Sequence, residues 1–310
     1  MIPWNYTQFK QIAQNILEDN RKWSAQGKVA DYIPELKKGD PNAMALVLAS
    51  RDGSLVVGDC DRLFTLQSIS KILTLMIALE DQGPAKVFFH VGKEPTGDPF
   101  NSIAKLETTA TARPLNPMIN AGAIAVCSLI KGKNSDDKIK RVLEFISMVV
   151  EREVTINAEV YQSEKETGHR NRALAYFMKD TEVLEGDVED VLDLYFKQCA
   201  IEVSCEELAK IGLFIAKKGE LTNGRRMVQR DTVRLVTTFM VTCGMYNASG
   251  EFAINAGIPA KSGVSGAIVA AVPNYLGIGT YGPALDEKGN SISGVHMLAD
   301  LADQLGLSIF

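Results

Sequence analysis

Apolar positions in this 310-residue chain follow a strand-like pattern near both ends and a helical pattern between them. Residues 5–25 place apolar side chains at helical spacing and predict an amphipathic helix. Residues 43–59 contain two β-prone runs on either side of Asp52-Gly53, a dipeptide typical of hairpin turns. The chain is therefore expected to begin with a helix followed by a β-hairpin.

The middle of the chain is predicted to be helical. Residues 136–150 repeat apolar side chains at helical spacing. Upstream of them, Asn116 is expected to cap a helix that has Pro117 in its first position. Downstream, Ser204 and Glu207 have the spacing of a capping box, which predicts that another helix begins there.

Strand signals return near the C-terminus. Residues 266–274 and 276–283 are short strand candidates, and a last helix is expected within residues 295–306. Strands at both ends with helices between them predict an α+β fold: one antiparallel sheet built from both chain ends, flanked by helices, beside an inserted all-helical subdomain. We expect a single domain over residues 1–310, with an α/β part at 1–66 and 255–310 and a helical part at 67–254.

Composition and charge exclude several classes of function. The chain is 46% hydrophobic and 23% charged with a net charge of −5, as is ordinary for a globular protein without a basic binding surface. Neither nucleic acid nor an anionic membrane is an expected partner. No signal peptide or membrane-spanning run is recognisable, and the five cysteines form no CxxC pair, so a cytoplasmic protein with reduced, buried thiols is expected.

The first candidate chemistry is a Ser-x-x-Lys pattern. It occurs four times, and its context singles out one case, because only Lys71 lies in a segment that is apolar on every side. Burial there would lower the pKa of Lys71, and its neutral amine could take a proton from Ser68 one helical turn away. A lysine that extends to solvent or pairs with Glu80 is the alternative. The other matches lie at a mixed stretch, a helix end and a polar helix start: Ser102/Lys105, Ser128/Lys131 and Ser135/Lys138.

A second pattern, Lys261-Ser262-Gly263, leads directly into a predicted strand. An early Ser-x-x-Lys and a late Lys-Ser-Gly are two of the three signature boxes of serine acyl-transfer enzymes of the penicillin-recognising type. The backbone N–H of Ser68 and one after Gly263 could then form an oxyanion hole.

Two other chemistries are not favoured. Residues 277–282 match GxGxxG, but the segment is itself strand-like and Pro283 follows, so a dinucleotide site is not expected. No metal-binding spacing is present, and no acid partner is recognisable for His90, His169 or His296, which makes a Ser-His-Asp triad a minority interpretation.

Nine blocks in order resemble the serine-dependent glutaminases, amidohydrolases that share the fold of serine β-lactamases. The resemblance extends over almost the whole chain and rests on KVADYIP, LQSISK, VGKEPTGDPFNS, NPMINAGAI, YQSEKETGHRN, YFKQCAIEVSC, CGMYNASGEFA, GIPAKSGVSGAI and LDEKGNSISG. It implies hydrolysis of L-glutamine without a cofactor or metal, and assembly into a homodimer or homotetramer.

The resemblance also implies a role for individual residues. Ser68 corresponds to the nucleophile, Lys71 to its general base and Tyr246 to a phenol that helps to move the proton. The N–H groups of Ser68 and Val264 correspond to the oxyanion hole. The implied substrate-binding set is Tyr32, Ser68, Asn120, Glu164, Asn171, Tyr195, Tyr246 and Val264.

Elementary chemistry agrees with that set, because free glutamine carries an ammonium and a carboxylate that both need partners. A carboxylate such as Glu164 suits the ammonium, whereas the Asn120 and Asn171 amides suit the carboxylate. On their own, Asn120 could merely occupy a first helical turn and Glu164 a solvated charged face. Two alternative functions stay open: a β-lactamase or penicillin-binding acyl transferase, and a non-catalytic glutamine-binding protein.

Overall fold

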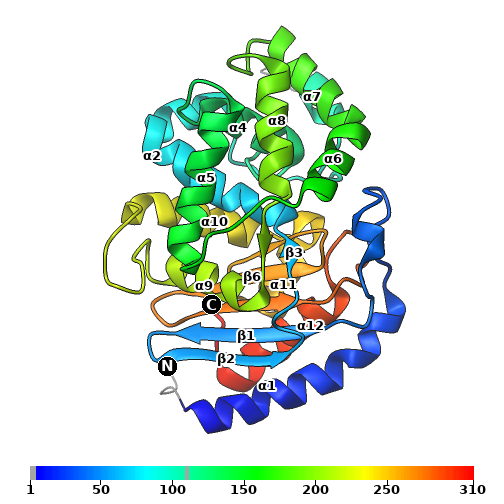
Figure 1. The fold of residues 1–310 in the computed structure, drawn as a ribbon, viewed down its shortest axis with the longest axis vertical. Helices are drawn as coiled ribbons and strands as arrows, with labels where there is room; N and C mark the ends of the chain where they lie inside the picture. The colour runs from blue at the N-terminus through cyan, green and yellow to red at the C-terminus, as the bar shows by residue number, and fades with distance from the viewer. Residues whose placement is uncertain (1–4, 109–111) are drawn as a thin grey trace.

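An antiparallel sheet joins the two ends of the chain in the computed structural model, which describes residues 5–108 and 112–310. Within that part the sheet has five strands in the order β2-β1-β7-β6-β5. This confirms the predicted α+β fold (Figure 1). The strands are β1 (Ala45–Ser50), β2 (Gly53–Gly58), β5 (Ala260–Ser262), β6 (Ala267–Val272) and β7 (Leu276–Tyr281), and a separate pair is formed by β3 (Phe64–Thr65) and β4 (Glu202–Val203).

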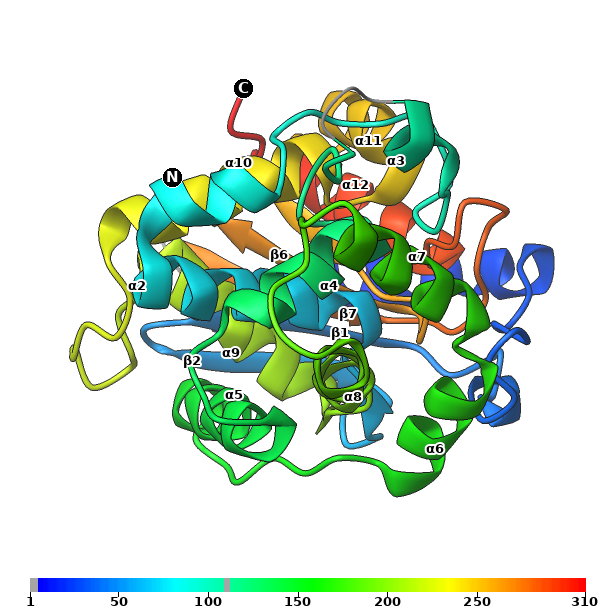
Figure 2. The same ribbon diagram turned by 90° about the horizontal axis from the view of Figure 1, so that it is seen from above.

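Helices cover both faces of the sheet. The terminal helices α1 (Tyr6–Asn20) and α12 (Ile292–Leu305) pack together on one face, and α9 (Cys205–Ala216) packs against β1, β6 and β7 on the other. The remaining helices lie beyond α9 or beside the sheet (Figures 1 and 2). They are α2 (Ser70–His90), α3 (Ala104–Thr108), α4 (Asn120–Leu129), α5 (Ser135–Val150), α6 (Ala158–Thr167), α7 (His169–Asp180), α8 (Val188–Cys199), α10 (Arg230–Cys243) and α11 (Ser249–Asn255).

The strand sequences match this two-sided burial. In β1 the small side chains of Ala45, Val47 and Ala49 join the core beneath α9, whereas Leu46 and Leu48 join the core beneath α1 and α12. Successive side chains of a strand point to opposite faces, so a continuous apolar run is what a strand covered on both faces requires. Small residues on the α9 side let that helix approach the sheet closely.

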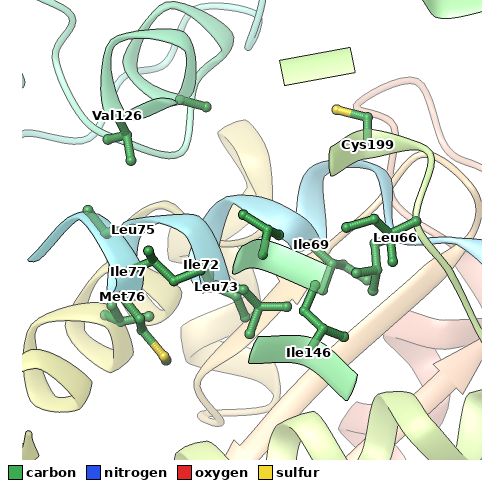
Figure 3. Close-up of a cluster of buried hydrophobic side chains, with 14 of the residues drawn as sticks. Leu66, Ile69, Ile72, Leu73, Leu75, Met76, Ile77, Val126, Ile146 and Cys199 are labelled. Atoms are coloured by element: carbon green, nitrogen blue, oxygen red, sulfur yellow. The ribbon is translucent and has the colours of Figure 1, made fainter. Parts of the chain in front are cut away.

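Helix α2 and the turn before it supply much of the core on the α9 side of the sheet. Ile69, Ile72 and Leu73 lie in a cluster of buried side chains with Val126 of α4 and Ile146 of α5 (Figure 3). Because α4, α5 and α10 pack around α2, its first turns can be apolar on every side. The helix is interrupted at Gly83, whose φ of 75° is readily adopted only by glycine.

Several local predictions are confirmed. Residues 276–281 form strand β7 with no helix opening on them, which agrees with the rejection of a dinucleotide site. The side chain of Ser204 accepts from the Glu207 N–H in a complete capping box. The N-terminal helix is shorter than expected, because the α-helix ends at Asn20 and a 3-10 turn follows.

The predicted cap at Asn116 is wrong. Helix α4 begins at Asn120 with Ile119 as its cap residue, three positions later than expected. The Asn116 side chain instead accepts from the N–H groups of Met118 and Ile119, at 3.0 and 3.2 Å, and so stabilises a turn that precedes the helix. Asparagine and proline favour such turns as strongly as they favour helix starts.

All five cysteines are free and buried. Among residues 5–108 and 112–310, no helix is both long and apolar enough to cross a membrane. The proposed boundaries between an α/β part and a helical part stay a prediction.

Candidate active site

A cavity of about 100 Å³ opens where the helices meet one end of the sheet. Ser68 lies on its wall, in a 3-10 turn (Gln67–Ile69) immediately before α2. Gln67 has a positive φ of 49°, a conformation that is unfavourable for a residue with a side chain and is often found at functional sites. Seven of the residues singled out in the sequence line this one cavity: Tyr32, Ser68, Asn120, Glu164, Asn171, Tyr195 and Val264.

Lys71 is almost completely buried, with 1% of its surface exposed. Its Nζ donates to the main-chain oxygen of Met118 at 3.2 Å and to Asn120 Oδ1 at 2.8 Å. Burial lowers the pKa of Lys71 from 10.5 to about 8, partly offset by nearby acidic groups including Glu164. In the described part of the chain no hydrogen bond joins Lys71 to Ser68 or to Glu80.

The alternative role for Lys71, an ion pair with Glu80, is therefore wrong. Glu80 instead accepts from the Gln229 N–H and the Thr232 hydroxyl. Lys71 faces Asn120, and the side chain of Asn120 continues the network by donating to Asn171 Oδ1 at 3.0 Å. The N–H of Asn120 donates to the Phe100 carbonyl at 2.9 Å, which fixes the start of α4 against the preceding loop.

Glu164 is a buried carboxyl on α6, with 6% of its surface exposed. Burial raises the pKa of Glu164 from 4.5 to about 7, and the Gln67 side chain and the Lys71 charge act in the opposite direction. The expectation that Glu164 might belong to a solvated face is thus wrong. A buried carboxyl whose pKa lies near 7 is a natural partner for a cation that enters the cavity, because the cation stabilises its ionised form.

Tyr246 borders a second, smaller cavity next to the first, and Phe100 borders both. Its φ of 53° is positive, and its ring lies 4.9 Å from the ring of Phe100. Burial raises the pKa of Tyr246 above its ordinary value, whereas the neighbouring Ser68 hydroxyl lowers it. Within the described residues the Tyr246 hydroxyl has no partner with full hydrogen-bond geometry.

Val264 reaches the cavity because the main chain passes very close to the Ser68 turn. A Cβ placed on Gly263 would lie 2.8 Å from the Leu66 carbonyl oxygen, so only glycine fits there. This explains the glycine of the Lys-Ser-Gly pattern, which brings the segment after β5 beside the segment before α2.

Two tyrosines complete the cavity wall. Tyr195 on α8 is buried and its pKa is raised by that burial. Tyr32 is 52% exposed as a residue, yet burial around its hydroxyl raises the pKa of Tyr32 as well. Both phenols are therefore neutral donors at ordinary pH.

Sequence reasoning gave no role in the site to several residues of this region. Gln67 and Cys199 line the cavity, and the fully buried Lys261 has its Nζ 4.5 Å from the centre of the Tyr246 ring. Burial and the charge of Lys71 lower the pKa of Lys261. The Lys-Ser-Gly pattern had marked Lys261, but nothing in the local sequence indicated that its side chain points towards the site.

The other lysines and the histidines lie elsewhere. Neither Lys131 nor Lys138 lines the cavity, and the Lys105 side chain falls outside the part that the structure describes. Over residues 5–108 and 112–310, none of the histidines lines the cavity and no cluster of acidic, cysteine or histidine side chains has the arrangement of a metal site.

Comparison with known proteins decides the family. A family model described as Glutaminase matches residues 27–310. The chain belongs to the glutaminase family. It is 51% identical over 304 residues to Glutaminase 2 of Clostridium perfringens, covering 97% of this chain and 100% of that one. It is also 54% identical over 302 residues to a glutaminase of Clostridium botulinum, covering 96% and 99%.

Solved structures of the family have the same fold, that of the serine β-lactamases. A probable glutaminase of Bacillus subtilis superposes with a TM-score of 0.92 at 39% identity, over 99% of both chains. A second structure, with a TM-score of 0.89 at 39% identity over 96% of this chain and 98% of the other, is a covalent complex of a Bacillus subtilis glutaminase. Its ligand, 5-oxo-L-norleucine, was formed by reaction with 6-diazo-5-oxo-L-norleucine.

Proposed function

We propose that this protein hydrolyses the side-chain amide of L-glutamine to L-glutamate and ammonia through a Ser68–Lys71 nucleophile. The observation that carries the proposal is the position of Ser68 in a small cavity that also holds a carboxyl, two linked amides and two phenols. The named activity of the relatives supports it, as does the covalent complex that a related glutaminase forms with a glutamine-like ligand.

The contacts of Lys71 suit a general base. A neutral amine has two N–H groups and one lone pair, and the two acceptors at Met118 and Asn120 can engage both N–H groups. The lone pair is then left without a donor from those residues. With a pKa of about 8, about one tenth of Lys71 is neutral at pH 7 and about half at pH 8, and the neutral amine can take the Ser68 proton.

The reaction then follows in two halves. Ser68 Oγ attacks the amide carbon, and the N–H groups of Ser68 and Val264 stabilise the oxyanion, each lowering the barrier by about 2.7–4 kcal/mol. The proton taken from Ser68 passes through Lys71 and Tyr246 to the leaving nitrogen, the C–N bond breaks, and ammonia departs. Water then attacks the resulting γ-glutamyl ester: its oxygen bonds to the acyl carbon, the bond to Ser68 Oγ breaks, and one of its protons passes to Ser68 Oγ as glutamate is released.

Recognition of glutamine rests on the rest of the cavity. The Glu164 carboxylate is assigned to the α-ammonium, which by its charge would also keep Glu164 ionised. Asn120, Asn171 and the phenols of Tyr32 and Tyr195 are assigned to the α-carboxylate and to positioning of the side chain. A substrate without both charged groups would leave buried polar atoms without partners.

The test is ammonia release from L-glutamine by the purified protein and by Ser68→Ala, with L-asparagine measured alongside. We expect turnover of glutamine by the wild type and a loss of at least about 1,000-fold in the variant, with an unchanged melting temperature. Near-normal activity of Ser68→Ala would contradict the assignment of the nucleophile.

The same preparation separates the alternatives. Hydrolysis of a chromogenic lactam in place of glutamine would favour the β-lactamase or penicillin-binding function. Saturable glutamine binding by the wild type without ammonia release would favour a binding protein.

Assembly into a homodimer or homotetramer is a further part of the proposal, supported by resemblance to the family. Light scattering coupled to size-exclusion chromatography should give a mass two or four times that of the 33.8 kDa chain. A mass equal to that of the single chain would contradict it.

A further inference from the structure

A third cavity, separate from the two beside Ser68 and Tyr246, lies at the other end of the sheet. It encloses about 380 Å³ between the β1–β2 hairpin turn, the end of α9, the start of α10 and the turn that joins β6 to β7. The hairpin turn and the loop after α9 lie at the left of Figure 1. No residue of this cavity also lines the candidate active site.

Positive charge dominates its lining. Five cationic and two acidic side chains surround the cavity, in a protein whose net charge is −5. We call these five cations the basic cluster: Arg51, Lys217, Lys218, Arg226 and Arg230. A helix C-terminus stabilises the two lysines that follow α9, but it gives no reason for arginines contributed by the hairpin and by α10.

Most of these cations are not neutralised. Arg226 forms an ion pair with Glu220, which leaves Asp52 as the remaining acid of the lining. Among the described residues, no ion pair or hydrogen bond joins the side chain of Arg51, Lys217, Lys218 or Arg230 to any carboxylate. Cationic side chains that share a concave site and outnumber its acidic side chains, here five to two, are the arrangement that recognises anions.

Lys217 shows the consequence of this crowding. It is half-buried, and its pKa is lowered first by burial and then by the charge of Arg51. The nearby acids Glu220, Glu151 and Asp52 only partly offset these effects, and a bound anion would oppose the repulsion from Arg51 and raise the pKa of Lys217. The Asn274 amide also lines the cavity and adds neutral N–H donors to the charged ones.

We propose that the basic cluster binds a small phosphorylated molecule with two or more negative charges. Planar guanidinium groups bind phosphate oxygens in pairs, and lysine ammonium groups add point charges, so the combination suits phosphate groups better than a single carboxylate. The volume accommodates a diphosphate group, and either an inorganic polyphosphate or a nucleoside polyphosphate provides this chemistry. The site does not depend on the proposed hydrolysis of glutamine.

The test is calorimetric titration of the full-length protein with inorganic pyrophosphate and, separately, with ATP, at constant ionic strength set with sodium chloride. The site variant is Arg51→Gln/Lys217→Gln. The matched control is Lys133→Gln/Lys140→Gln, which removes two exposed positive charges from the region of α5.

We expect saturable binding with one site per chain in the wild type and the control, weakened at least about tenfold in the site variant. Equal affinities for the two ligands would show that the phosphate groups suffice, and tighter binding of ATP would show that the nucleoside contributes. The proposal is overturned if the wild type shows no saturable binding up to about 10 mM, or if the site variant binds as the wild type does. The melting temperatures of the variants without ligand check that each is folded.

Discussion

At the scale of single residues, the two perturbed groups beside Ser68 determine how activity should depend on pH. In the proposed mechanism Glu164, with a pKa of about 7, must be ionised to hold the substrate ammonium, and Lys71, with a pKa of about 8, must be neutral to act as a base. Both conditions improve as the pH rises. We expect kcat/KM for glutamine to increase from about pH 6 to about pH 8.5, as measured from initial rates of ammonia release.

A flat profile over that range would contradict the assigned roles. Because kcat/KM reports the free enzyme, the measurement is not affected by the influence of bound substrate on Glu164. A profile for kcat alone should have its acid limb at lower pH, because the substrate ammonium favours the ionised carboxyl.

Glu164 should also lower the stability of the protein at neutral pH. Its folded-state pKa of about 7 lies above the ordinary 4.5, so the folded protein holds the proton more tightly than the unfolded chain. Ionisation therefore reduces the free energy of unfolding progressively from about pH 4.5 to 7, by about 3 kcal/mol in total. Glu164→Gln has no carboxyl to ionise, so it should have a higher free energy of unfolding than the wild type at pH 8.

Urea unfolding at pH 8 and at pH 5 measures this difference, which should shrink at the lower pH. The control is Glu159→Gln on the same helix, where the carboxylate side chain is 76% exposed and the change should stay below about 1 kcal/mol at both pH values. A Glu164→Gln variant less stable than the wild type at pH 8 would contradict the inferred cost of burying the charge.

A residue of the site could be predicted from the sequence only where its neighbours in the chain made it unusual. Lys71 stood out because a cation in an all-apolar segment is unusual, and its burial followed. Glu164 carried no such signal, since its neighbours on α6 are mostly polar and its burial comes from packing against distant elements. Resemblance to the family was therefore needed to single out Glu164.

At the scale of elements, helix α9 and strand β7 pack closely through glycines of the strand. A Cβ on Gly277 would lie 2.0 Å from the Leu213 N and 2.2 Å from the Ala209 carbonyl oxygen. Gly279 meets the same helix, where its Cβ would lie 2.5 Å from the Cys205 carbonyl oxygen. The glycines that imitate a nucleotide-binding fingerprint are thus required for helix–sheet packing.

Gly277→Ala should therefore be destabilising, although alanine is ordinarily the better residue within a strand. Backbone atoms cannot move aside as a flexible side chain can, so we expect a loss of at least about 2–3 kcal/mol in the free energy of unfolding. Gly250→Ala in α11 is the control, because its Cβ meets no atom within 4 Å and should stabilise the helix by about 0.5–1 kcal/mol. Equal effects of the two substitutions, measured by urea unfolding, would contradict this account of the packing.

The helices and strands themselves were predictable where their signals were local. The Asp52-Gly53 hairpin and the Ser204 capping box were found because a few adjacent residues determine them. The start of α4 was not, since Asn116 and Pro117 satisfy the requirements of a helix start and of a turn equally well. The bond from the Asn120 N–H to the Phe100 carbonyl helps to fix the later start, and no local pattern reports a contact between residues so far apart in the chain.

At the scale of the whole molecule, the candidate active site draws its walls from segments far apart in the chain. Val264 follows strand β5, Asn120 begins α4, and Glu164 lies on α6. A ligand that contacts all three groups binds only when the sheet and the helices are both folded. Its binding free energy therefore adds to the stability of the whole molecule.

The contribution of ligand binding to stability can be measured with the variant Ser68→Ala, because it should bind L-glutamine without hydrolysing it. With L-glutamine at about 100 times its Kd, the free energy of unfolding should rise by about 2.7 kcal/mol, and the rise should follow the logarithm of the ligand concentration. Adding Glu164→Gln to that variant removes the partner of the substrate ammonium and should abolish most of the gain. If glutamine stabilised both variants equally, Glu164 would have no part in recognition, whereas stabilisation of Ser68→Ala alone would tie the cavity to its ligand without relying on turnover.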